Sequence, residues 1–153
     1  MLERAGVQTL VDIRRYPGSR RNPQYNCGAL EQALAESGVV YRHAEELGGR
    51  LSGEPGEERF ACIRQPAFRS YAARMGTDEW QEALASVLAE PAPCLMCAET
   101  PWTKCHRRFI ADVLVARGHE ALHLSPGGVE PHRLAEEAEV RDRRLYLCGE
   151  LVA

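Results

Sequence analysis

Short apolar runs alternate with segments of helical periodicity along most of the chain. The runs end at glycine and proline, and between them apolar side chains recur at every third or fourth position. This pattern predicts strands at residues 8–14, 39–43, 94–98 and 120–124, helices at 27–37, 77–90 and 105–117, and one or two short helices within 59–74. Strands that alternate with helices indicate a parallel sheet. The expected fold is a single three-layer α/β domain over residues 1–153, Rossmann-like and with a mostly parallel sheet.

The end of the chain is more polar. After the turn residues 125–128, a helix is predicted at 133–144 and a final edge strand at 145–148. No internal repeat or low-complexity linker interrupts this order, which again favours one domain.

Length and composition fit one globular domain with a sizeable core. The chain has 153 residues, 44% of them hydrophobic, and a formal net charge of −3. A weakly acidic chain has no general attraction to nucleic acid or membrane surfaces, so any basic function has to be local. The apolar runs are too short to span a bilayer, and no apolar segment follows the mixed charges of residues 1–4. We therefore expect a cytoplasmic protein with no signal peptide and no membrane partner.

Six cysteines are many for a chain of this size: Cys27, Cys62, Cys94, Cys97, Cys105 and Cys148. With no export signal and enough apolar residues for a core, reduced thiols are expected rather than a disulfide framework. Cys94, Cys97, Cys105 and His106 are side chains of the types that bind zinc. However, Cys94 and Cys97 are three positions apart in a predicted strand, so they point to opposite faces. We therefore assign Cys94 to the core and predict no metal site.

The segment from 94 to 118 carries the densest group of reactive side chains. Cys97 and Glu99 follow a predicted strand, and Cys105, His106 and Arg107 begin the next predicted helix. Strand ends and helix starts are where α/β folds bind ligands, and unpaired N–H groups there favour an anion, including a thiolate. The alternatives are a small cysteine that packs the helix against the sheet, and arginines that only pair with nearby acids. Glu99 is either a general base or one of those acids.

A second cluster follows the first predicted strand. Asp12 lies within that strand, and Arg14, Arg20 and Arg21 lie in a loop that Pro-Gly and Asn-Pro keep irregular. Asp12 is either a polar residue on a solvent face or a buried carboxylate that needs a partner. Because guanidinium groups suit phosphate and carboxylate, the arginines of the two clusters are predicted to bind an anion.

Several motifs occur in one order along the chain. They are Val11-Asp12-Ile13-Arg14, Pro17-x-Ser19-Arg20, Pro23-x-Tyr25-Asn26, Tyr41-x5-Leu47-Gly48-Gly49-Arg50, Tyr71-x3-Met75, Leu95-Met96-Cys97-Ala98-Glu99 and Cys105-His106-Arg107. Through them the chain resembles, from residue 6 to residue 124, the domain-of-unknown-function 488 family of bacterial and archaeal proteins. The resemblance implies an α/β fold and brings no established activity.

The resemblance also implies a missing element. Family members usually begin with an extra strand and a Thr-Ile-Gly-His-Ser turn, whereas this chain starts at Met1-Leu2-Glu3-Arg4, late in the helix that follows. The usual N-terminal strand is therefore expected to be absent. An uncovered sheet edge favours pairing with a second copy of the chain, so a homodimer is one expected assembly.

The residues expected to form the site come from both clusters and from the family motifs. The candidate catalytic residues are Asp12, Glu99, Cys105 and His106, and the candidate anion-binding residues are Arg14, Ser19, Arg20, Arg50 and Arg107. The first functional hypothesis is an enzyme that acts on a phosphorylated or nucleotide-like small molecule. The alternatives are a nucleic-acid-binding module that contacts backbone phosphates, and a non-catalytic interaction subunit. The sequence indicates no particular cofactor.

Overall fold

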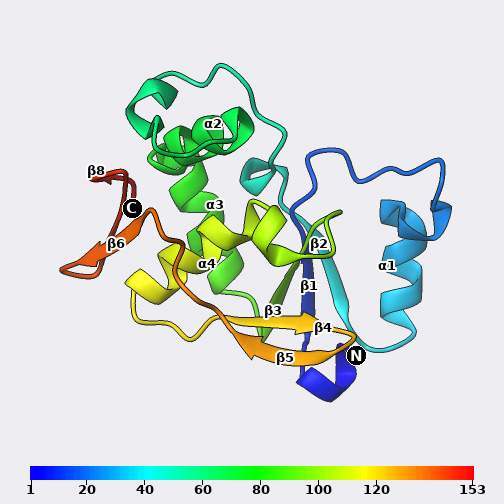
Figure 1. Cartoon of the computed structure of the whole chain (residues 1–153). Helices are drawn as coiled ribbons and strands as arrows, with labels where there is room; N and C mark the ends of the chain where they lie inside the picture. Colours follow the sequence, from blue (N-terminus) through cyan, green and yellow to red (C-terminus); the bar gives the residue numbers. More distant parts are fainter. The chain divides into compact units, whose positions relative to one another are not determined.

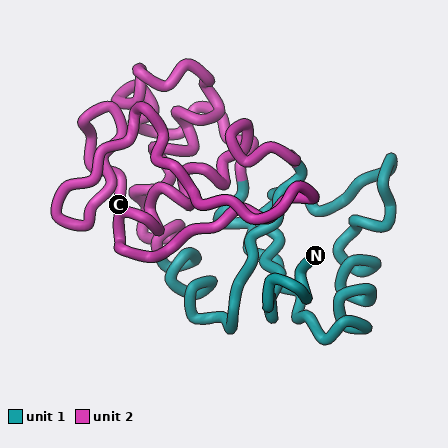
Figure 2. Tube along the Cα trace, turned by 60° about the horizontal axis from the view of Figure 1, so that its bottom comes forward, with its two compact units in different colours: residues 1–48, 82–98 teal, residues 49–81, 99–153 magenta.

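The structure, a computed structural model, describes all residues from Met1 to Ala153. The chain divides into two compact units, which Figure 2 colours separately. The first unit consists of Met1–Gly48 and Glu82–Ala98, and the second of Gly49–Gln81 and Glu99–Ala153. Each unit has sheet strands of its own.

The first unit is built on three parallel strands (Figure 1). In spatial order they are β2 (Val40–His43), β1 (Thr9–Asp12) and β3 (Pro93–Met96). All four residues of the central strand β1 are buried, as expected for a strand inside a parallel sheet. At its carboxyl end Asp12 is in register with His43 on one side and Met96 on the other. The carboxyl ends of all three strands therefore form one edge, with Asp12 at its centre.

Helix α1 (Cys27–Ala35) packs on this sheet. Leu10, Leu34 and Val39 are the buried centre of the packing, so the helix contributes through Leu34. Cys94 is partly buried and packs against the same cluster, so it lies at the margin of the core in which it was predicted.

Helix α3 (Asp78–Leu88) begins in the second unit and ends in the first. Its later turns are tied to β2, because Arg42 donates from Nη1 to the carbonyl oxygen of Ser86 at 3.0 Å and from Nη2 to Ser86 Oγ at 2.6 Å. Arg42 also forms an ion pair of 2.5 Å with Glu90, just beyond the helix.

The second unit contains α2 (Pro66–Met75) and α4 (Arg107–Ala116). Pro66 stands in the first turn of α2, where its missing N–H has no helical partner to lose. Tyr71, Trp80 and Phe109 are completely buried, and Trp80 Nε1 donates to Tyr71 Oη at 3.2 Å. These aromatic residues are core, as their spacing indicates. None of the helices is long and apolar enough to cross a membrane.

Short 3-10 helices connect the larger elements. They are Glu3–Ala5, Pro23–Tyr25, Glu45–Leu47, Glu57–Phe60 and Trp102–Lys104. The last one leads directly into α4, and Cys105 N–H donates to the carbonyl oxygen of Trp102 at 3.0 Å between them.

The strands of the second unit are all antiparallel, which differs from the expected sheet. They are β4 (Leu122–Ser125) paired with β5 (Gly128–Pro131), and β6 (Ala138–Arg141), β7 (Arg144–Leu147) and β8 (Glu150–Leu151) in a second sheet. The strand predicted at 120–124 exists as β4, but the chain turns after it and β4 pairs with β5 in a hairpin. Ser125 pairs with Gly128 across a two-residue Pro-Gly turn, a connection that makes a hairpin rather than a parallel crossover.

The predicted helix at 133–144 is wrong. Its second half is the hairpin of β6 and β7, in which Arg141 pairs with Arg144. The two residues between them, Asp142 and Arg143, have φ of 49° and 62°, the left-handed pair that matches the twist of a tight hairpin. Helix propensity is a weak preference that tertiary pairing overrides. The final strand was expected at a sheet edge, but β7 lies in the middle of its sheet.

The expectation of reduced thiols does not hold for two of the six cysteines. Cys62 and Cys148 form a disulfide across 86 residues of sequence, and both belong to the second unit. A cross-link over such a long loop restricts the unfolded chain and stabilises the fold by about 2–4 kcal/mol. Cys27, Cys94, Cys97 and Cys105 stand outside the disulfide.

The α/β class is thus confirmed in a coarse form. Four helices accompany a three-stranded parallel sheet and separate antiparallel sheets. The parallel sheet is smaller than predicted because β4 pairs with β5 instead of joining it.

Candidate functional site

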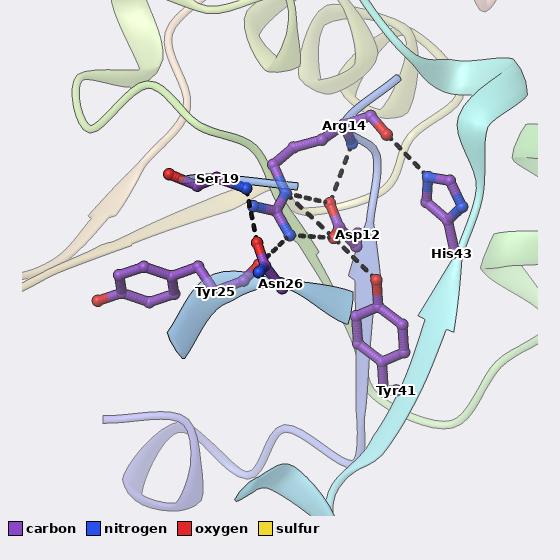
Figure 3. A network of polar contacts seen from close by, with 7 residues as sticks. All are labelled: Asp12, Arg14, Ser19, Tyr25, Asn26, Tyr41 and His43. Carbon is purple, nitrogen blue, oxygen red and sulfur yellow. Dashed lines mark hydrogen bonds and ion pairs between the residues drawn. The ribbon is translucent and has the colours of Figure 1, made fainter. Parts of the chain in front are cut away.

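Asp12 is the centre of a polar network in the first unit (Figure 3). Its side chain is fully buried, and both carboxylate oxygens accept hydrogen bonds. Oδ1 accepts from the backbone N–H of Arg14 at 3.0 Å and from Arg14 Nε at 2.8 Å, and Oδ2 accepts from Arg14 Nη2 at 2.6 Å and from Tyr41 Oη at 2.9 Å. Of the two alternatives for Asp12, the structure shows the buried carboxylate, and its partner is two residues away.

The same network fixes the start of the arginine-rich loop. Arg14 Nη2 also donates to the carbonyl oxygen of Tyr25 at 2.7 Å, and the Arg14 carbonyl oxygen lies 2.8 Å from His43 Nε2. The hydrogen bond with Asp12 raises the pKa of Arg14. Burial, followed by the hydrogen bond with Asp12, raises the pKa of Tyr41. Arg14 is thus held by the protein itself, and the geometry favours a positioning role for it and for Asp12.

Ser19 and Arg20 lie further along this loop. The backbone N–H of Ser19 donates to Asn26 Oδ1 at 2.6 Å, and Ser19 Oγ accepts from the N–H of Asn22 at 3.0 Å. These bonds shape the turn before α1, whereas Arg20 extends from it with an exposed side chain. Arg20 and its neighbour Arg21 therefore face solvent, whereas Arg14 does not.

The Gly48-Gly49-Arg50 motif has a steric basis. A Cβ on Gly48 would lie 2.7 Å from the carbonyl oxygen of Glu45, and one on Gly49 would lie 2.6 Å from His106 Nδ1. Neither distance is tolerated by a real side chain. Arg50 has a left-handed φ of 61° and is exposed. Gly49 therefore brings its backbone directly against the ring of His106, within the second unit.

Cys105 sits where α4 begins. It is 1% exposed, and its Sγ accepts from the backbone N–H of Arg107 at 3.5 Å and from Arg107 Nε at 3.4 Å. His106 Nδ1 is 3.7 Å from the same sulfur. A cationic guanidinium, a helix N-terminus and an imidazole all favour a negatively charged sulfur. The sequence expectation of a thiolate-stabilising position is thus supported by three separate groups.

Arg107 is fixed in turn by the loop before it. Its Nη2 donates to the carbonyl oxygens of Glu99 at 2.5 Å and Thr100 at 3.4 Å. The next residue, Arg108, has a different role, because it forms an ion pair with Glu137 and its guanidinium lies 4.4 Å from the centre of the Phe109 ring. Of the two neighbouring arginines, only Arg107 belongs to the cluster with Cys105.

The second unit thus brings together four of the predicted residues: Glu99 through its backbone, Cys105, His106 and Arg107. Within this unit Cys105 and His106 offer a sulfur and a ring nitrogen, donors of the types that bind a metal ion. The first unit groups Asp12, Arg14 and Ser19 around their own loop.

Two tyrosines were missed as partners of the site residues. Tyr41 donates to Asp12, and the ring of Tyr71 lies 4.8 Å from the ring of His106. Both stand in the family motifs, so a signal was present in the sequence. Their contacts could not be read from spacing, because each joins segments at least 29 residues apart.

Comparison with known families assigns the chain. A model of the domain of unknown function DUF488 matches residues 1–114. The chain belongs to the DUF488 family. Comparison with curated proteins and with solved structures gave no match. All nine candidate residues fall inside the DUF488 match, whereas the strands from β4 onward lie beyond it.

Replacing Asp12 by alanine should destabilise the protein by about 3–5 kcal/mol, because it leaves the Arg14 guanidinium buried without its carboxylate. The Arg14 side chain is 10% exposed and that of Asp12 is 0%. Glu90→Ala removes the carboxylate of the Arg42 pair, whose side chains are each 29% exposed, and should lower stability by no more than about 1 kcal/mol. Urea unfolding of both variants measures the difference. Equal losses would contradict a structural role for the Asp12 pair.

Gly49→Ala should destabilise the protein by about 1–3 kcal/mol, because the new methyl group overlaps the His106 ring. Gly28→Ala is the matched control. Gly28 lies in α1 with open space where its Cβ would be, so this change should be neutral or stabilising by about 0.5–1 kcal/mol. Thermal unfolding compares them, and NMR of the His106 ring should show a shift in Gly49→Ala alone. An unshifted His106 signal would argue against the contact.

Proposed function

We propose that this protein is an enzyme that acts on a phosphorylated or nucleotide-like small molecule. Arg107 binds the anionic group of the substrate, and Cys105 lies beside the reacting atom. The observation that carries the proposal is the double contact of Arg107 with Cys105 Sγ, through the backbone N–H and through Nε. Packing alone accounts for the burial of Cys105 but does not require a guanidinium in contact with its sulfur.

The guanidinium of Arg107 is prepared for a ligand. Nε donates to Cys105 Sγ, and Nη2 donates to the carbonyl oxygens of Glu99 and Thr100. Nη1 is therefore the nitrogen proposed to bind the anion. Because the side chain is already held in one orientation, binding sacrifices little side-chain entropy. The positive end of the α4 dipole adds to the attraction.

The remaining candidates have supporting roles in the proposal. His106, packed between Gly49 and Tyr71, is the imidazole nearest the sulfur and can exchange a proton with it. The exposed Glu99 is the proposed acid or base, with its backbone already bound to Arg107. The exposed Arg50, in the same unit as Arg107, is the proposed additional anion contact. In the first unit, Asp12, Arg14 and Ser19 hold the loop that carries the exposed Arg20, which we propose as a separate anion contact.

The test is calorimetric binding of inorganic phosphate and of a nucleoside monophosphate to Arg107→Ala. Losing one charge-assisted contact should weaken binding by about 10-fold to 100-fold. Arg64→Ala is the matched control, since Arg64 is an exposed arginine of the same unit and should leave affinity unchanged.

Unchanged phosphate affinity in a folded Arg107→Ala protein would contradict the proposal. Tight binding to duplex DNA or RNA, with a log–log salt slope of about −0.7 to −0.9 for each phosphate contacted, would instead favour the nucleic-acid-binding alternative.

A further inference from the structure

A chain of three polar side chains, two fully buried and one half-buried, runs through the second unit, apart from the residues discussed so far. Asp112 Oδ1 on α4 lies 2.9 Å from His132 Nε2, and His132 Nδ1 lies 2.9 Å from His123 Nε2 on β4. The side chains of Asp112 and His132 are both fully buried. Two imidazoles and a carboxylate in this order can pass a proton from His123 through His132 toward the buried Asp112.

The outer member of this chain lies close to the Cys105 cluster. The His123 ring stacks on Trp102, with ring centres 4.1 Å apart and planes 2° from parallel, and Trp102 begins the short helix that leads to Cys105. Burial, the neighbouring His132 and the charge of Arg107 lower the pKa of His123 to about 4, against the opposing charge of Glu130. His123 is therefore neutral at neutral pH and near enough to Arg107 to sense its charge.

A purely structural explanation accounts for only part of the chain. Asp112 Oδ1 also accepts from the backbone N–H of Ala135 at 3.2 Å, so Asp112 and His132 do fasten the loop after β5 to α4. That fastening uses one imidazole, and it leaves out His123, which stacks on Trp102 instead. It also leaves Asp112 Oδ2 buried without a hydrogen-bond partner. A buried carboxylate with an unsatisfied oxygen is stabilised when a full positive charge stands next to it.

We propose that Asp112, His132 and His123 form a proton relay that serves the Cys105–Arg107 site, with His123 as its general base. A water or hydroxyl that reacts at the site gives its proton to His123 Nδ1. The proton on His123 Nε2 then passes to His132 Nδ1. In this step the O–H bond and the Nε2–H bond of His123 break, and N–H bonds form at His123 Nδ1 and at His132 Nδ1. His123 is neutral again, and the positive charge is on His132, beside the Asp112 carboxylate.

Electrostatics explain why the charge moves inward. The Arg107 guanidinium that would bind the anion repels a positive charge on His123, whereas Asp112 attracts one on His132. A single histidine beside Arg107 would be a weak base. Passing the proton one residue further separates it from Arg107 and pairs it with a carboxylate.

This inference rests on the proposed function, but two of its three residues lie outside the part of the chain that matches the family. Asp112 lies within the matched residues 1–114, whereas His123 and His132 lie beyond them. The relay can therefore fail while the proposed anion site stands.

The experiment measures proton uptake when sulfate binds to the full-length protein. Sulfate is a dianion that does not titrate near neutral pH, so any proton taken up enters the protein. Calorimetry in two buffers of different ionisation enthalpy gives the number of protons. We expect the parent protein to take up a proton, because an anion beside Arg107 favours the charged relay. Asp112→Asn keeps the oxygen that accepts from Ala135 and should bind sulfate without the uptake.

Two further variants complete the design. Glu136→Gln removes a carboxylate from an exposed position of the loop after His132, and it should leave the uptake unchanged. If Asp112→Asn does not fold, His123→Gln tests the outer end of the relay and should abolish the uptake in the same way.

Each outcome decides between the proposals. Sulfate binding with an uptake that persists in Asp112→Asn or His123→Gln would overturn the relay, because another group such as His106 would be taking the proton. Binding by the parent with no uptake would also overturn the relay and leave the anion site intact. If the parent does not bind sulfate, the anion site is removed, and the relay loses the site that it serves.

Discussion

A charge taken out of water must find an opposite charge or a set of hydrogen bonds, and this requirement organises both units of the protein. Asp12 is fully buried at the end of β1 and is satisfied by Arg14 and Tyr41. Asp112 is fully buried on α4 and faces His132. In each case the chain supplies the partner from a loop, so the compensation of one buried carboxylate also fixes the path of an irregular segment.

The same requirement separates arginines that pair with acids of the protein from Arg107, which we propose as a ligand-binding residue. Arg14, Arg42 and Arg108 each form an ion pair with a carboxylate, and the guanidinium of Arg108 also lies over the ring of Phe109. Arg107 instead ends on backbone carbonyl oxygens and on a sulfur. Carbonyl oxygens orient a guanidinium without neutralising it, although a Cys105 thiolate would offset part of its charge. This difference is the reason for locating the proposed function at Arg107 and not at the first cluster.

The sequence predicted those elements whose partners are close along the chain. Apolar periodicity and the positions of glycine and proline predicted the strand before Arg14 and the helices that begin near Cys27, Asp78 and Arg107. The same pattern placed Cys94 on the inner side of its strand. The residue types at the start of α4 also indicated a thiolate position. Long-range pairing could not be predicted in this way. The contact between Tyr41 and Asp12, and the disulfide that spans 86 residues, depend on which loops meet after folding. The hairpin at 138–147 was missed because alanine and glutamate favour a helix only when nothing stronger competes.

The proposed function requires one chemical state, a Cys105 thiolate held by Arg107. The ultraviolet absorbance of the thiolate at neutral pH measures it directly, as the difference between the parent protein and Cys105→Ser, which cancels the other cysteines. The same difference is then taken in an Arg107→Met background, which keeps an unbranched side chain but removes the charge. The account predicts a thiolate signal in the parent that falls in Arg107→Met. An absent signal in the parent, or an equal signal in both backgrounds, would contradict it.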